Sequence, residues 1–130
     1  MLKLKPSILI VDDDIRILDL LKQFFSKNNF EVFTAISVEH AEQCLKESKV
    51  DLIILDVMLP KINGMEFAKK IKDSGSDMPI IMLTALSDPQ DRLRGLKAGA
   101  NEYISKPFEP SQLLLKVLNL INNYNIEKIN

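Results

Sequence analysis

The hydrophobic residues of this chain fall into short unbroken runs that alternate with longer segments, in which they recur every three or four positions. The clearest runs are residues 8–11 and 52–55, and an aspartate directly follows each of them. Residues 79–84 form a third run, which begins with a proline, the position where a strand tolerates one best. Unbroken apolar runs of this length are typical of strands buried on both faces of a parallel sheet. The pattern therefore predicts three central strands.

Two weaker strands and five helices complete the pattern. Residues 30–34 alternate only partly and residues 101–105 are short and polar, so both are expected at sheet edges. The helices are predicted over residues 15–27, 37–48, 63–74, 88–98 and from residue 110 onward. In the first helix, Leu18, Leu21 and Phe25 form the apolar stripe. In the last, the predicted face is Leu114, Val117, Leu118 and Ile121.

Five strands that alternate with five helices predict an α/β fold, a doubly wound five-stranded parallel sheet with helices on both faces. Because the second and last strands are the polar ones, the strand order 2-1-3-4-5 of flavodoxin-like folds accommodates them at the two edges.

The length and composition of the chain indicate a single domain, and its net charge does not indicate binding to nucleic acid or to an anionic membrane. It has 130 residues, of which 46% are hydrophobic and 27% charged, enough to bury one core. The formal net charge of −1 provides no basic field for nucleic acid or an anionic membrane. Cys44 is the single cysteine, which excludes an internal disulfide and agrees with a cytoplasmic location. The apolar run at residues 8–11 is too short for a signal peptide or a membrane span.

The predicted strand order gathers acidic residues at one end of the sheet. The first and third strands become neighbours, so Asp12, Asp13 and Asp56 should converge where ligands bind in such sheets. Crowded carboxylates repel one another unless a cation lies among them, and oxygen ligands alone favour Mg²⁺. Thr84 and Lys106 should reach the same edge, where a hydroxyl and an ammonium suit the oxygens of a phosphoryl group on Asp56. The set predicts an aspartyl phosphate site.

Taken in order, these motifs resemble the receiver domain of two-component response regulators. The resemblance covers residues 7–121 and rests on the ordered segments Ile8-Leu9-Ile10-Val11-Asp12-Asp13, Asp56 with Leu59-Pro60 and Gly64, Leu83-Thr84-Ala85, Gly99-Ala100, and Tyr103-Ile104-Ser105-Lys106-Pro107-Phe108. It implies that Asp56 is the phosphoacceptor, that Asp13 binds Mg²⁺ directly, and that Asp12 acts on the ion directly or through water. Met58 would supply a backbone carbonyl to the metal, and Thr84 and Lys106 would bind the phosphoryl oxygens. The Lys106–Pro107 peptide bond would be cis and would orient the lysine.

The same resemblance implies a signalling switch that assists its own phosphorylation and dephosphorylation, not an enzyme. The phosphodonor would be the histidine of a partner kinase or phosphotransfer protein. Thr84 and Tyr103 would couple the site to the face made by the fourth helix, last strand and last helix, which would contact an effector domain or protein. Residues 1–121 would be the receiver domain, and residues 122–130 a tail that extends the last helix or begins a linker. Both a complete single-domain regulator and a piece of a longer protein remain open.

Several residues on this face bear on self-association. Relatives that dimerise there pair opposite charges, and this chain keeps Arg92, Glu102 and Lys116 but has the neutral Asn101 and Gln112 where acids are usual. We therefore expect weak or no homodimer. Gly95 lowers the helix propensity of the fourth helix, which suits an element that must move. Leu113 and Leu120 either widen an apolar stripe toward a partner or belong to the core.

The same residues allow other interpretations. Asp14 is interpreted as an acid at the start of the first helix, where the helix dipole favours it, and His40 as an exposed helix residue. Thr84 as an ordinary strand-end residue and Lys106 as a solvated lysine are each tenable alone but improbable together. A flavodoxin-like electron carrier needs a Ser/Thr- and Gly-rich loop after the first strand, where this chain has three acids. An Asp-nucleophile phosphatase needs a second acid two residues after the nucleophile, where this chain has Met58. An interaction module without phosphorylation is disfavoured because the whole acceptor set is present.

Overall fold

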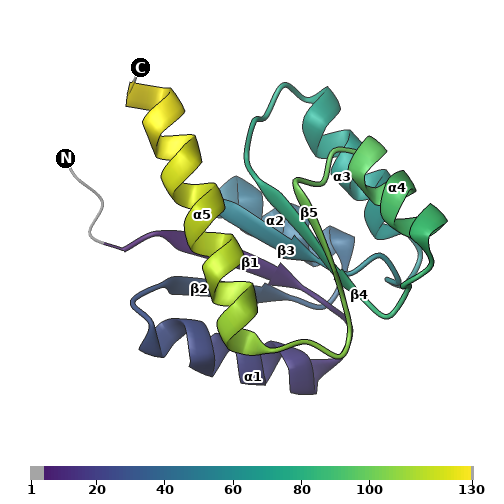
Figure 1. The fold of residues 1–130 in the computed structure, drawn as a ribbon, viewed down its shortest axis with the longest axis horizontal. Helices are drawn as coiled ribbons and strands as arrows, with labels where there is room; N and C mark the ends of the chain where they lie inside the picture. Colours follow the sequence, from purple (N-terminus) through teal and green to yellow (C-terminus); the bar gives the residue numbers. More distant parts are fainter. Residues whose placement is uncertain (1–4, 130) are drawn as a thin grey trace.

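The computed structural model describes the backbone of residues 5–129 and the side chains of residues 5–123. Within them the chain forms five parallel strands in the order β2-β1-β3-β4-β5 and five helices (Figure 1). The elements are β1 (Ser7–Val11), α1 (Ile15–Lys27), β2 (Glu31–Ala35), α2 (Val38–Glu47), β3 (Leu52–Leu55), α3 (Gly64–Asp73), β4 (Ile80–Thr84), α4 (Pro89–Lys97), β5 (Glu102–Ser105) and α5 (Pro110–Ile129). The predicted fold class and strand order are confirmed.

The core consists of two apolar layers, one on each face of the sheet. Neighbouring residues of a strand point to opposite faces, so β1 contributes Ile8 to one layer and Leu9 to the other. Helices α1 and α5 cover the first face, while α2, α3 and α4 lie on the second (Figure 1). Burial on both faces explains why β1, β3 and β4 read as unbroken apolar runs.

Four helices begin directly after a capping residue. The side chains of Asp14, Ser37, Asn63 and Asp88 each accept a hydrogen bond from a backbone N–H of the following turn. Such caps satisfy donors that would otherwise lack a partner inside the helix. They also set where each helix leaves the loop that follows a strand.

The buried face of α5 differs from the predicted one. Val117 and Ile121 are buried as expected, but Leu118 is exposed and Leu113 takes its place in the core. Positions 113, 117 and 121 are spaced by four residues and therefore lie on one side of the helix. Leu120 is partly buried and packs against the same layer, so both Leu113 and Leu120 contribute to the core.

The last helix continues beyond the body of the domain. Ile121 is its last described buried residue, and the ribbon of α5 runs on past the sheet to Ile129 (Figure 1). The predicted tail at residues 122–130 thus continues the helix at least to residue 129, although its side chains from residue 124 lie outside the described residues. In the described part of the chain, no helix combines the length and the apolar character needed to cross a membrane.

Candidate functional site: an acidic cluster at the carboxyl end of the sheet

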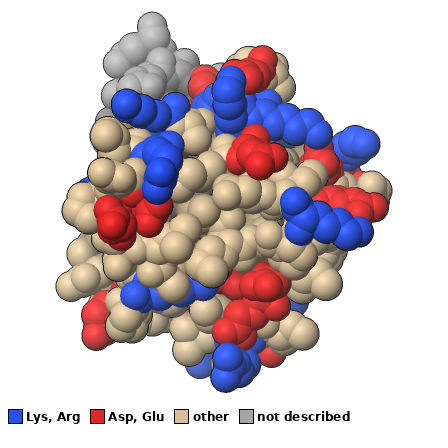
Figure 2. All heavy atoms as spheres, turned by 90° about the vertical axis from the view of Figure 1, so that its right-hand side faces the viewer, with Lys and Arg blue, Asp and Glu red and all other residues tan. Residues whose placement is uncertain are grey.

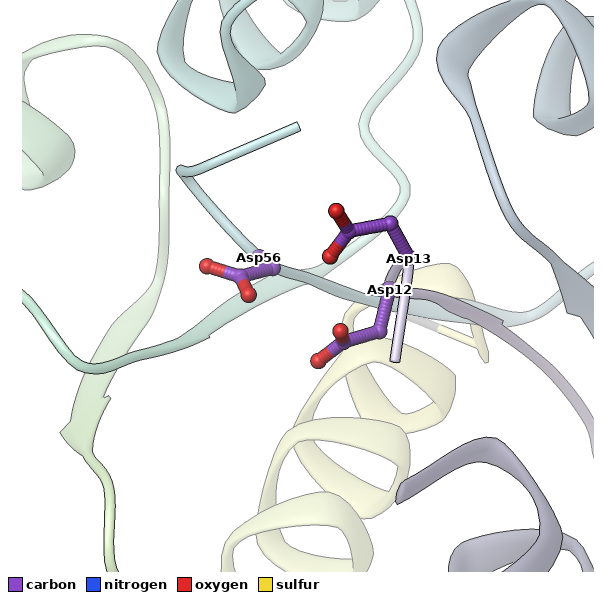
Figure 3. A group of neighbouring side chains, drawn as sticks. All are labelled: Asp12, Asp13 and Asp56. Atoms are coloured by element: carbon purple, nitrogen blue, oxygen red, sulfur yellow. The ribbon is translucent and has the colours of Figure 1, made fainter. Parts of the chain in front are cut away.

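Three carboxylates meet where β1 and β3 end. Val11 pairs with Leu55 across these neighbouring strands, so Asp12 and Asp56 leave the sheet at the same level. Asp13 follows Asp12, and Figure 3 shows the three side chains directed into a common space. One oxygen from each carboxylate lies within 4.8 Å of the others. Asp12 and Asp56 are buried, whereas Asp13 is exposed.

Backbone N–H groups hold the two buried carboxylates in place. Oδ1 of Asp12 accepts a hydrogen bond from the Asp14 N–H at 2.9 Å, and Oδ1 of Asp56 accepts one from the Met58 N–H at 3.0 Å. Each bond spans two residues, a local pattern that Asp forms readily in turns. The two Oδ2 atoms are thereby left to face other partners.

Lys106 is the partner of both Oδ2 atoms. Its Nζ lies 2.7 Å from Oδ2 of Asp12 and 3.0 Å from Oδ2 of Asp56. The backbone N–H of Lys106 donates to the carbonyl of Thr84 at 2.8 Å, which ties the lysine to the end of β4. The Lys106–Pro107 peptide bond is cis. The two bonds from Nζ to the carboxylates are charge-assisted and therefore stronger than hydrogen bonds between neutral groups.

Burial and neighbouring charges have opposite effects on the pKa values of Asp12 and Lys106. Burial raises the pKa of Asp12, although Lys106 and the Asp14 N–H offset part of the change. Burial alone would lower the pKa of Lys106, but the hydrogen bonds and charges of Asp12 and Asp56 outweigh it and raise that pKa. The lysine therefore stays charged and partly compensates the acidic cluster.

The acidic cluster suits a hard divalent cation. Among the described residues, Asp12, Asp13 and Asp56 form the group whose donor atoms are close enough to share an ion. All three donors are carboxylate oxygens, which Mg²⁺ prefers over nitrogen or sulfur. Three acids faced by a single ammonium also leave a local excess of negative charge. The residues present fit Mg²⁺.

Thr84 and two apolar residues lie where β3 and β4 end. Thr84 ends β4 and is fully buried, and its hydroxyl oxygen accepts a long hydrogen bond of 3.4 Å from the Leu86 N–H. Leu86 is partly buried, and the side chain of Met58, in the loop after β3, is 55% exposed. The positions two residues beyond Asp56 and Thr84 therefore present apolar side chains.

Tyr103 lies on β5 and is hydrogen-bonded to the loop that follows β4. Its ring is buried, and its hydroxyl donates to the Leu86 carbonyl at 2.7 Å, in the loop that also follows Thr84. Burial raises the pKa of the Tyr103 phenol, and the charges of Asp91 and Asp56 add to the shift. Thr84 and Tyr103 thus share Leu86 as a hydrogen-bonding neighbour, one through its N–H and the other through its carbonyl.

Gly64 is a site residue whose role the sequence did not indicate. A Cβ on Gly64 would lie 2.1 Å from the carbonyl oxygen of Asp56 and 2.8 Å from Cα of Val57. The Gly64 N–H donates to the Val57 carbonyl at 2.8 Å, so the loop folds back tightly on the end of β3. A lone glycine at the start of a helix gives no sign of such an approach. It is visible only once the loop is folded.

Comparisons with known proteins agree with this geometry. The family model described as "Response regulator receiver domain" matches residues 8–118, and the chain belongs to that family. It is thus a receiver domain of two-component response regulators, a class of signalling switches rather than enzymes of the usual kind. The family predicted from the sequence motifs is confirmed.

Particular relatives and structures support the assignment. The chain is 39% identical over 121 residues to "Regulatory protein VanR" of Enterococcus faecium, an alignment that covers 93% of the chain and 52% of that protein. It is 41% identical over 112 residues to "Protein PetR" of Rhodobacter capsulatus, covering 86% of the chain and 47% of that protein. The chain therefore spans about half the length of these curated relatives.

Solved receiver domains match over nearly their whole length. The non-phosphorylated HemR receiver domain of Leptospira biflexa has a TM-score of 0.82 and 36% identity, covering 90% of this chain and 94% of that one. A CheY-like receiver domain protein of Methanospirillum hungatei has a TM-score of 0.89 and 32% identity, covering 95% and 98% respectively.

Proposed function

We propose that this domain is a phosphorylation-dependent switch that accepts a phosphoryl group on Asp56 from a partner histidine kinase or phosphotransfer protein. The observation that carries the proposal is the pairing of Lys106 with both Asp12 and Asp56 beside a third carboxylate. An ammonium held 3.0 Å from Asp56 is already positioned to meet the oxygens of a phosphoryl group attached there. Residues 1–121 are the proposed receiver domain, acting in the cytoplasm.

The transfer itself requires little covalent chemistry from the domain. A carboxylate oxygen of Asp56 bonds to phosphorus while the P–N bond of the donor phosphohistidine breaks, and the departing imidazole nitrogen keeps the electron pair. Asp12, Asp13, Asp56 and the backbone carbonyl of Met58 would hold Mg²⁺. When bound, the ion would neutralise charge on the cluster and on the transferred group. Lys106 and the Thr84 hydroxyl would bind the phosphoryl oxygens.

The response is proposed to leave through the face made by α4, β5 and α5. Thr84 and Tyr103 meet at Leu86, so a shift of Thr84 toward a phosphoryl group would be felt by the tyrosine. Phosphorylation would act by shifting a pre-existing equilibrium of this face. Its target would be an effector domain or protein. This domain itself is not expected to contact nucleic acid or membrane.

Charge on this face bears on how it could pair. Glu102 and Lys116 form an ion pair of 3.1 Å within the chain itself, which occupies two of the charges available for pairing across a dimer. Figure 2 looks onto the side of the molecule that carries α3 and α4, which is only part of this face, and shows acidic and basic residues interspersed around an uncharged middle. We therefore propose weak or no homodimer through this face.

Intact-mass measurement after incubation with acetyl phosphate and Mg²⁺ tests the proposal. The parent protein should gain the mass of one phosphoryl group, and the gain should vanish when EDTA removes the metal. Asp56→Asn should abolish it, because an amide oxygen cannot form the acyl phosphate. Asp14→Asn is the matched control, since Asp14 caps α1 and lies outside the cluster. Undiminished labelling of Asp56→Asn would refute the site assignment.

A further inference from the structure

We infer that Gly95 and Arg92 are positioning residues that hold Tyr103, one at its ring and the other at its backbone carbonyl, and that these two contacts fix α4 on the sheet. The inference deepens the proposed switch and rests on it for its functional meaning. Its structural content concerns only how α4 and β5 are joined.

Helix α4 is anchored unlike the other helices of the fold. The structure describes all of its residues, and the single buried one is Gly95. Its large apolar residues Leu93 and Leu96 are 53% and 39% exposed. A surface helix normally holds its place by burying an apolar stripe, and α4 has none. What keeps it in position must therefore come from a few specific contacts.

The first contact is between Gly95 and the ring of Tyr103. A Cβ placed on Gly95 would lie 2.7 Å from Cδ2 and 2.8 Å from Cε2 of that ring, closer than side chains pack. The ring cannot easily yield, because it is buried and its hydroxyl is held by the Leu86 carbonyl at 2.7 Å. The missing side chain of Gly95 thus makes the seat into which the tyrosine fits.

The second contact joins α4 to the backbone of the same tyrosine. Nη1 of Arg92 donates to the carbonyl oxygen of Tyr103 at 3.1 Å. Strand β5 lies at the edge of the sheet, where an outward carbonyl needs a partner from another element. Arg94, two residues further along the helix, instead forms an ion pair with Asp91 within α4. The two arginines therefore have different roles despite equal charge.

These contacts make the ring of Tyr103 and the position of α4 interdependent. If the ring turned outward, the seat on Gly95 would be left open and α4 would lose the contact around its one buried residue. If α4 moved, the ring would lose its cover on that side. A glycine at position 95 therefore permits the inward ring, and any larger residue opposes it.

Tyrosine fluorescence tests the seat directly. The chain has two tyrosines and no tryptophan, so Tyr124→Phe leaves Tyr103 as the only emitter. Adding Gly95→Ala should raise the acrylamide quenching constant several-fold, because the ring is displaced into solvent. Lys97→Ala, an exposed substitution in the same helix, is the control and should leave quenching unchanged. Equal quenching of the Gly95→Ala variant and its parent would overturn the inference.

A double-mutant cycle covers the case in which Gly95→Ala folds poorly. Alanine favours a helix over glycine, so in a Tyr103→Ala background, where no ring is present, Gly95→Ala should raise the melting temperature. In the parent background the same change should lower it. The same sign and size of shift in both backgrounds would refute the seat. Arg92→Ala should increase quenching of Tyr103, and Arg94→Ala should not; equal effects would refute the role of Arg92.

Neither measurement uses a phosphodonor. If the contact between Gly95 and Tyr103 were refuted, the proposed phosphorylation of Asp56 would be unaffected. If Asp56 failed to accept a phosphoryl group, the inferred contact between Gly95 and Tyr103 would be unaffected.

Discussion

Replacing Lys106 by alanine should destabilise the domain when magnesium is absent, and magnesium should restore much of the loss. The lysine is the cation that two buried carboxylates share, at 2.7 and 3.0 Å. Without it, Asp12 and Asp56 face each other and Asp13 uncompensated. A bound divalent cation would neutralise the same oxygens, so the effects of the lysine and of the metal should overlap.

The size of the loss follows from burial. The side chains of Asp12 and Asp56 are 3% and 7% exposed, and that of Lys106 is 17% exposed. Removing one partner from a buried ion pair costs about 3–5 kcal/mol, and the partial exposure of the lysine places this case at the lower end, about 3 kcal/mol. The pair of Lys116 with Glu102 is a contrast, because those side chains are 50% and 30% exposed. Breaking it should cost less than about 1 kcal/mol.

Urea unfolding of the parent, Lys106→Ala and Lys116→Ala, each in EDTA and in excess Mg²⁺, measures these differences. A ligand that binds only the folded state at 100 times its Kd adds about 2.7 kcal/mol to the free energy of unfolding. That gain should be larger for Lys106→Ala than for the parent, and equal to the parent's for Lys116→Ala. The reasoning is wrong if Lys106→Ala loses less than about 1 kcal/mol in EDTA, or if magnesium stabilises it no more than it stabilises the parent.

Three further outcomes are expected. Asp13→Ala should raise the Kd for Mg²⁺ at least several-fold in calorimetric titration, and an unchanged Kd would place the ion elsewhere. The aspartyl phosphate should hydrolyse slowly, because neither Met58 nor Leu86 can align a water. A polar pair at those positions should speed the loss of label in intact-mass time courses, and an unchanged rate would remove this explanation. Sedimentation with a phosphoryl mimic at Asp56 should show mainly monomer, and a tight symmetric dimer would show that Asn101 and Gln112 do not matter.

Strand order and the convergence of the three aspartates could be predicted because both follow from simple patterns. Burial on two faces requires unbroken apolar runs, and the runs at residues 8–11 and 52–55 are the strands that lie side by side in the sheet. Parallel strands end at the same edge, so the aspartates after these runs were bound to meet. The pattern also distinguished the edge strands, since β2 and β5 are only partly buried.

The rotation of α5 could not be predicted with the same certainty. Residues 113–115 are all leucine, so several helical faces fit the periodicity equally well. Only packing against α1 and the sheet selects Leu113 over Leu118 for burial. Composition within a single helix carries no information about which neighbour it will meet.

Contacts between segments that are distant in the sequence could not be predicted either. The sequence suggested that Gly95 weakens α4, whereas the structure shows that it also makes room for Tyr103. The bonds from Lys106 to two separate acids and from Arg92 to a strand edge likewise depend on how loops fold. Residue type predicted what these side chains can do, but their partners come from tertiary structure.

The tight turn at Gly64 has a consequence for how this chain tolerates mutation. Any side chain at position 64 would displace the carbonyl of Asp56, and with it the carboxylate that we propose as the phosphoacceptor. In a library randomised at this position and selected for signalling, glycine should be recovered almost alone, although residue 64 contributes no functional group. Genetic screens would score it as an active-site residue, and what they would be measuring is the space it leaves empty.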